Sequence, residues 1–318
     1  MSPSLARAAA ALTALGSVLA IAPGASAAGK PPPAASASPL RLQLQRVYTL
    51  QARRVALLHQ RVRVRGVAPT AVGQVARVTV RIGRRTVVRA SRTVQPDGTF
   101  SLELRAHRAG PLRAYATLAG ASAVRSRLAR VIVPSAGPGT RGTRVVFLQH
   151  RLRDLRYLVP YSGVYDSGTA LAVMAYRKVT GMQRANNANR RIFQNLAVRR
   201  GRFHVRYPNH GKHIEANLGR QVLALIDSHG KVFRVLTLSS GKPSTPTVLG
   251  SFRVYSQTPG FNSHGMLDSN YFVGGYAIHG YADVPPYAAS HGCLRIPIPD
   301  ARFVIRWLRI GDPVDVYR

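Results

Sequence analysis

The sequence predicts a mainly β protein with a helical segment in the middle of the chain. Apolar residues alternate with arginines and other polar residues over residues 61–134, which is the period of half-buried strands. Between residues 145 and 196 they recur three and four positions apart, which is the period of amphipathic helices. From Phe203 the strand pattern returns. It is interrupted by residues 255–275, which are rich in Gly, Ser and Asn and are expected to form a long loop.

The first 27 residues have the composition of a signal peptide. They carry one basic residue, Arg7, then an apolar run over 8–22 and a small-residue cleavage site, Ala25-Ser26-Ala27. The apolar run is too short and too rich in alanine for a typical membrane span. We therefore expect export, with membrane attachment only through an uncleaved signal. Residues 28–60 are expected to form a Pro/Ala-rich linker and lead-in.

Residues 61–135 are expected to form an immunoglobulin-like β-sandwich. Turn signals at Gly83-Arg84 and Pro96-Asp97-Gly98 separate the alternating apolar runs. Short antiparallel strands at this spacing are typical of such sandwiches. Arginines occupy the opposite face of these runs, either as a solvated surface or as a surface that binds anions.

The chain is strongly basic, with a formal net charge of +35. Between Arg41 and Arg202 there are 32 Lys and Arg against four Asp and Glu, whereas residues 203–318 hold 12 against seven. A charge of this size indicates an anionic partner or surface. Nucleic acid does not fit as that partner, because the chain carries an export signal and no motif that interleaves aromatic and basic residues.

Residues 136–202 are predicted to form a module of three helices. Four apolar residues between 145 and 155 share one face of the first helix. Asp166 is the expected N-cap of a second helix, which ends at Gly181, and a third short helix is expected around residue 192.

This helical segment resembles the three-helix peptidoglycan-binding module. Residues 145–152 have the form V-x-x-L-Q-x-x-L, residues 157–158 are Y-L, and residues 163–169 read G-V-Y-D-S-G-T. Arg156 stands where the family usually has glycine. The resemblance implies the three-helix fold of that module. The alternative interpretation is a helical spacer that binds no ligand.

The only cysteine of the chain, Cys293, lies in the polar tetrapeptide Ser290-His291-Gly292-Cys293. A thiol acts as a nucleophile when a base or a positive charge is near, and His279 and His291 are the candidates for the base. An unpaired cysteine in an exported protein indicates a reactive thiol. Structural cysteines normally lie among apolar neighbours, so this setting favours catalysis.

Residues 203–318 resemble the catalytic domain of YkuD-type L,D-transpeptidases. The signature of that family is His-Gly at a strand end, a loop, and then Ser/Thr-His-Gly-Cys followed by an apolar residue and Arg or Asn. This chain has Ile278-His279-Gly280 and Ser290-His291-Gly292-Cys293-Leu294-Arg295. Two further elements of the family have counterparts in S-S-G-K at 239–242 and T-V-L-G-S-F at 247–252.

The resemblance implies three catalytic groups. Cys293 is the nucleophile, His279 is the general base, and the carbonyl of Gly280 orients His279, as the third member of Ser and Cys triads does.

Four further residues are implied around the substrate. Ser290 and His291 shape the pocket, and the N–H groups of Gly292 and Cys293 hold the oxyanion. Arg295 holds a substrate carboxylate or braces the loop.

The implied reaction is acyl transfer on peptidoglycan stem peptides, and it needs no metal or cofactor. Cys293 forms a thioester with one stem, and the amine of a second stem resolves it as a cross-link. If water resolves the thioester, the same site is an L,D-carboxypeptidase. We therefore expect a cell-wall enzyme outside the cell, whose partners are stem peptides and anionic wall polymers.

Two other classes of function remain open. A zinc peptidase would use His279, His291 and Cys293 as ligands, although no carboxylate base lies near them in the sequence. A non-catalytic wall-binding protein would have no need of the intact Ser-His-Gly-Cys motif.

Overall fold

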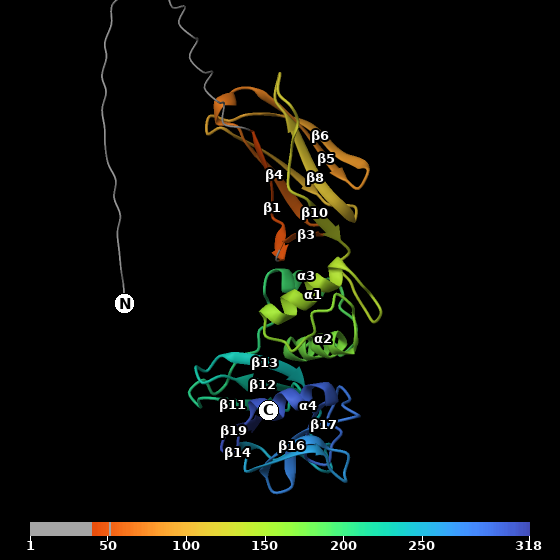
Figure 1. Cartoon of the computed structure of the whole chain (residues 1–318), viewed down its shortest axis with the longest axis vertical. Helices are drawn as coiled ribbons and strands as arrows, with labels where there is room; N and C mark the ends of the chain where they lie inside the picture. The colour runs from red at the N-terminus through yellow and green to blue at the C-terminus, as the bar shows by residue number, and fades with distance from the viewer. Residues whose placement is uncertain (1–39, 51) are drawn as a thin grey trace, which may run out of the picture. The chain divides into compact units, whose positions relative to one another are not determined.

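The structure, a computed structural model, describes residues 40–50 and 52–318. The predicted signal peptide and the linker up to residue 39 lie outside the described residues. Strands, three helices and again strands follow one another along the chain, so the predicted order is confirmed (Figure 1). Leu40–Arg318 forms one unit by its contacts. No helix in the described part is long and apolar enough to cross a membrane.

The first ten strands form two sheets. They are β1 (Arg41–Gln45), β2 (Tyr48–Leu50), β3 (Arg53–Leu57), β4 (Arg61–Val67), β5 (Val75–Ile82), β6 (Arg85–Thr93), β7 (Thr99–Arg105), β8 (Gly110–Thr117), β9 (Val124–Arg125) and β10 (Ala129–Ile132), with a 3-10 turn at Pro69–Ala71. One sheet has the order β1-β4-β7, and the other has the order β2-β3-β10-β8-β5-β6 with β9 paired to β8. Apolar residues of both sheets, such as Val64 and Val80, share one buried cluster.

Two details differ from the sequence prediction. Residues 41–45, 48–50 and 53–57 of the expected lead-in form β1, β2 and β3. Leu42 and Leu44 already alternate with exposed neighbours and enter the core. The pair β3 and β10 is parallel, whereas the sequence suggested antiparallel strands throughout. The immunoglobulin-like identity of these sheets stays a prediction.

The three predicted helices are α1 (Thr143–Asp154), α2 (Ser167–Val179) and α3 (Arg190–Ala197). Asp166 caps α2 as expected, since its carboxylate accepts the Thr169 N–H at 2.8 Å. The Asn189 side chain caps α3 in the same way, at 3.1 Å from the Ile192 nitrogen. The two caps satisfy amide groups that the first turn of a helix leaves without partners.

Two helices end on an arginine in the left-handed backbone conformation. Arg156 follows the C-cap of α1 with φ of 72°, and Arg199 follows the C-cap of α3 with φ of 56°. Glycine is the usual residue at this position because a side chain costs roughly 1 kcal/mol there.

Residues 203–318 contain two more sheets and one helix. The elements are β11 (His213–Asn217), β12 (Val222–Ile226), β13 (Val232–Thr237), β14 (Gly250–Arg253), β15 (Ser256–Phe261), β16 (Leu267–Val273), β17 (Tyr276–Tyr281), β18 (Leu294–Pro297), α4 (Ile298–Trp307) and β19 (Pro313–Tyr317). The sheets have the orders β13-β12-β11-β19-β14 and β15-β16-β17-β18. Helix α4 contacts β16, β17 and β18, and one apolar cluster fills the space between these elements.

The expected long loop at 255–275 is instead a pair of strands, β15 and β16. Asp268, Ser269 and Asn270 of β16 are buried, and Asp268 and Asn270 find hydrogen-bond partners across the sheet. Asn270 donates to the Ile278 carbonyl at 3.1 Å, and the Asp268 carboxylate accepts the Gly260 N–H at 2.9 Å. Composition alone predicts a loop here, but satisfied hydrogen bonds allow a polar strand to be buried.

The helices cover one face of the sheet that begins at β13. Val222, Ala224, Ile226 and Val235 belong to the same buried cluster as the helix residues. Lys178 of α2 is also buried, and it donates to the Thr237 hydroxyl at 2.5 Å and to the Leu238 carbonyl at 2.9 Å. Burial lowers the pKa of Lys178 to about 7.

This packing predicts that residues 203–318 are unstable without the helices. Burying a side chain such as Val235 stabilises a fold by about 1.5–3 kcal/mol, and several such residues would become exposed. We expect a fragment of residues 203–318 to unfold at a lower temperature than a fragment of residues 136–318, and to bind a dye for exposed apolar surface. Equal unfolding temperatures would contradict this account of the packing.

Candidate active site

The parallel pairing of β17 with β18 brings the predicted catalytic residues together. His279 lies opposite Arg295 in the register, and Cys293 directly precedes β18. Alternate residues of a strand lie on the same face. Because Ile278 and Leu294 point into the apolar cluster, His279, Cys293 and Arg295 share the other face.

The thiol of Cys293 is half-buried and contacts the backbone of β17. Its sulfur accepts the Ala277 N–H at 3.4 Å and lies 3.8 Å from the Gly275 carbonyl oxygen. Burial raises the pKa of the Cys293 thiol, against the smaller opposing effects of the Ala277 N–H and the Arg295 charge. The resting group is therefore the neutral thiol, which needs a base to become a nucleophile.

The imidazole of His279 is 2% exposed and is held in one tautomer. Its Nδ1 lies 3.0 Å from the Gly280 carbonyl oxygen, which can only accept, so Nδ1 carries the proton and Nε2 is free to act as a base. Burial lowers the pKa of His279, the Gly280 carbonyl raises it and Arg295 lowers it. His279 is thus neutral near pH 7, as a general base must be.

Gly280 has a second role that requires its small size. A Cβ atom at this position would lie 2.7 Å from the Cβ of Ala301 on α4. Helix α4 therefore packs directly on the backbone that presents the carbonyl to His279.

Arg295 is half-buried and lies opposite His279 in the strand register. Its guanidinium carbon is 4.1 Å from the centre of the Tyr281 ring, a cation–π contact. Its charge lowers the pKa of both His279 and Cys293. In the described part of the chain it forms no ion pair, so its charge is available to a substrate carboxylate.

The Ser290 hydroxyl closes the turn before Cys293, and this changes one predicted role. It donates to the Cys293 carbonyl at 2.6 Å and accepts the Gly292 N–H at 3.1 Å. The Gly292 N–H is therefore occupied and is not free to hold an oxyanion in this conformation, contrary to the sequence expectation. The Cys293 N–H has no acceptor among the described residues and is the remaining candidate.

Gly292 is required by the ring of Tyr276, which sequence reasoning missed. Its φ is 120°, and a Cβ atom there would lie 1.8 Å from the Tyr276 ring. The aromatic residue follows Gly274-Gly275, but no sequence pattern indicates that it packs against the Ser-His-Gly-Cys turn.

The segment 239–247 braces the same turn. Thr247 Oγ1 donates to the Gly292 carbonyl at 2.7 Å and accepts the Gly241 N–H at 2.9 Å. The Lys242 N–H donates to the Ser290 carbonyl at 2.9 Å. The S-S-G-K and T-V-L-G-S-F elements were visible in the sequence, but their role in bracing was not.

His291 differs from His279 in its burial. Its side chain is exposed, and its Nε2 is 3.3 Å from the Lys242 ammonium. Among the described residues, no group of three or more His, Cys, Asp or Glu side chains is arranged to hold a metal ion.

The two pKa shifts predict how Cys293 reacts with iodoacetamide. Because the thiol pKa is raised, the rate of alkylation should keep rising with pH beyond the value at which an ordinary cysteine levels off. His279→Ala should slow the reaction near pH 7, whereas His291→Ala, whose imidazole is exposed, should leave the profile nearly unchanged.

Alkylation of the urea-unfolded protein supplies the reference profile. A rate that is constant from about pH 6 to 9 would mean a resting thiolate–imidazolium pair and would contradict a neutral resting state of His279 and Cys293. If only His291→Ala lost reactivity, His291 and not His279 would be the general base.

Residues 211–316 match the YkuD family, described as the L,D-transpeptidase catalytic domain. L,D-transpeptidase 1 of Mycobacterium tuberculosis is 30% identical over 29% of this chain and 45% of its own length. The chain thus spans about half the length of this curated relative.

The crystal structure of the L,D-transpeptidase from Xylanimonas cellulosilytica is similar over a larger part of the chain. It is 31% identical, covers 58% of this chain and 98% of its own, and superposes with a TM-score of 0.55. The match over 211–316 includes the histidine and cysteine elements described above. The chain therefore belongs to the YkuD family of L,D-transpeptidases.

Proposed function

We propose that this chain is a cell-wall L,D-transpeptidase that cross-links peptidoglycan through a Cys293 thioester. The observation that carries the proposal is the hydrogen bond from His279 Nδ1 to the Gly280 carbonyl at 3.0 Å, on the strand face that also holds Cys293. It leaves Nε2 as a base beside a thiol that is neutral at rest. Membership of the YkuD family supports acyl transfer as the chemistry of such a pair.

The first half-reaction acylates the cysteine. His279 Nε2 takes the thiol proton while the Cys293 sulfur attacks the carbonyl at the L-centre of a stem-peptide diamino acid. The Cys293 N–H stabilises the oxyanion that forms. The C–N bond to the terminal D-alanine then breaks, the imidazolium protonates the leaving amine, and a thioester remains.

The second half-reaction transfers the acyl group. An amine of a second stem attacks the thioester and loses a proton to His279. The C–S bond breaks, and the Cys293 thiolate takes that proton, so both groups return to their neutral resting state. Arg295, without an ion-pair partner in the described residues, holds a carboxylate of a stem.

The proposal includes the identities of the two parts before residue 203. Residues 61–135 act as an immunoglobulin-like spacer, and residues 136–202 act as a peptidoglycan-binding-like module. Gln149, the glutamine of the module's motif, is buried and bonds to Val164 and Thr169 inside the module. Its role is structural, so any wall contact comes from other residues.

Mass spectrometry of products from disaccharide-tetrapeptide tests the function. The purified protein should release D-alanine and form cross-linked dimers, and a carbapenem should label it covalently. Cys293→Ala should abolish both reactions with thermal unfolding nearly unchanged, because the side chain is small and half-buried. Full activity of that variant would refute the assignment. Shortened stems without dimers would identify an L,D-carboxypeptidase.

The location follows from the same proposal. We infer export to the cell wall, where anionic polymers attract the basic front half of the chain. In the described residues of that half, Glu103 pairs with Arg46 at 3.2 Å and with Arg63 at 2.7 Å. The edge strand β6 carries Arg85, Arg89 and Arg92 on exposed positions, with no carboxylate partner among the residues that the structure describes.

Retention on isolated wall should therefore depend on salt. The screening length falls to about 8 Å at physiological ionic strength, so binding should weaken steeply above it. Replacing Arg85, Arg89 and Arg92 with Gln should lower the salt concentration at half-retention. Replacing Arg253, Arg306 and Arg309 of the C-terminal part, which are also exposed, should have a smaller effect.

Wall stripped of its phosphate polymers provides the second arm of this test. Retention that responds neither to salt nor to stripping would show that these arginines only solubilise the edge of a sheet.

A further inference from the structure

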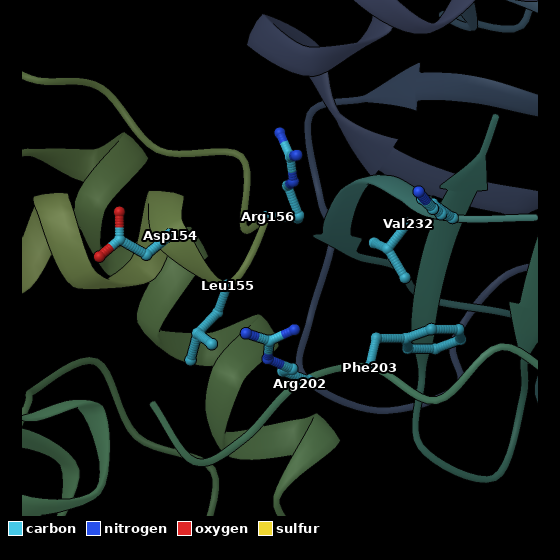
Figure 2. A pocket seen from close by; sticks show the side chains of 7 residues that line it. Asp154, Leu155, Arg156, Arg202, Phe203 and Val232 are labelled. Atoms are coloured by element: carbon cyan, nitrogen blue, oxygen red, sulfur yellow. The ribbon is translucent and has the colours of Figure 1, made fainter. Parts of the chain in front are cut away.

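A cavity of about 370 Å³ lies where the end of α1 meets β13 and the segment at residues 202–203 (Figure 2). It contains none of the residues of the proposed reaction. Its lining consists of Asp154, Leu155, Arg156, Arg202, Phe203, Lys231 and Val232. Its volume is within the range of small-ligand sites.

Three of the lining residues are exposed cations, of which Lys231 lies close enough to Asp227 to lower the pKa of that carboxyl. Arg156, Arg202 and Lys231 form no ion pair and no side-chain hydrogen bond with the described residues. The single acid, Asp154, does not neutralise them. Its carboxylate pairs with Arg151 at 3.0 Å, and in Figure 2 it lies away from the labelled arginines.

Further positive charge lies close to Arg156. Arg234 of β13 is half-buried, and after burial itself the charges of Arg156 and Arg153 lower the pKa of its guanidinium. Crowded like charges raise the free energy of the folded protein. A bound anion would lower this free energy by offsetting part of the positive charge.

The backbone of Arg156 has a φ of 72°, a conformation in which glycine is favoured. Arg199 has the same conformation and does not line the cavity, so the backbone alone assigns no function to either side chain. The conformation does mean that glycine can replace Arg156 without backbone strain.

The arrangement of the cations selects the class of ligand. Figure 2 shows the guanidinium groups of Arg156 and Arg202 well apart and not directed at a common point. A single phosphate group favours converging donors. Buried Leu155 and Phe203 and half-buried Val232 supply the apolar part of the lining.

We propose that this cavity binds an acidic peptide, whose separated carboxylates pair with Arg156, Arg202 and Lys231 and whose small apolar side chains cover Leu155 and Val232. The site is separate from the Cys293 centre and does not depend on the reaction proposed there. It gives the chain a second point of contact with peptide carboxylates.

The test measures binding of a fluorescein-labelled Ala-Glu-Ala-Glu peptide to the whole protein by anisotropy at physiological salt. Arg156→Gly should weaken binding about fivefold, the effect of losing one ion pair of about 1 kcal/mol. The same variant should unfold at an unchanged or higher temperature, because glycine suits the backbone at this position. Arg202→Gln and Lys231→Gln should each weaken binding to a similar degree.

Arg199→Gly is the matched control. It removes the same charge from the same left-handed position after a helix, but it does not line the cavity. It should leave the affinity within about twofold of the unchanged protein, as expected for an exposed charge that does not line the cavity. Equal weakening by Arg156→Gly and Arg199→Gly would overturn the site in favour of general attraction to a basic surface.

Two further comparisons test the ligand class and the location. An Ala-Gln-Ala-Gln peptide that binds equally well would overturn the role of the carboxylates, and inorganic tripolyphosphate that binds more tightly than the acidic peptide would overturn the peptide class. Protein alkylated at Cys293 should bind the acidic peptide unchanged. Loss of binding on alkylation would place the peptide in the active site and overturn the second site.

Discussion

The parallel pairing of β17 with β18 is the constraint on which the site depends. Parallel neighbours cannot be joined by a tight turn, so the chain must make a crossover between them. Here the crossover is the segment at 282–293, and its last four residues are Ser290-His291-Gly292-Cys293. His279 and Cys293 are therefore separated in the sequence by the residues that the crossover needs. The pairing itself fixes which side chains share a face.

Burial decides the protonation state of that face. Both His279 and Cys293 lose solvation, which disfavours charge on each and leaves a neutral pair at rest. Arg295 supplies positive charge near both groups and favours the thiolate once a proton has moved. The free site therefore holds a neutral imidazole and a neutral thiol close to the positive charge of Arg295.

The helices before residue 203 are part of the same structural unit as the enzyme. Their apolar faces cover Val222, Ala224 and Val235, and Lys178 reaches into the sheet at Thr237. Two of the settings of positive charge differ. On the edge strand β6 the arginines are exposed on a strand, whereas Arg156 and Arg202 line a cavity together with apolar residues. The cavity therefore provides shape as well as charge.

The sequence by itself determined the local features of this protein. Its periodicity indicated strands, three helices and strands, Asp166 was recognisable as a cap, and one cysteine with its histidines indicated the family. Such signals lie within a few residues, where side-chain chemistry acts directly on the backbone. Only the tertiary structure decided the rest. In the structure, most of residues 255–275 form paired strands, and the first sheet begins already at Arg41. The Gly292 N–H donates a hydrogen bond to the Ser290 hydroxyl. These outcomes depend on which distant segment supplies a hydrogen-bond partner or an apolar surface, and no local pattern contains that information.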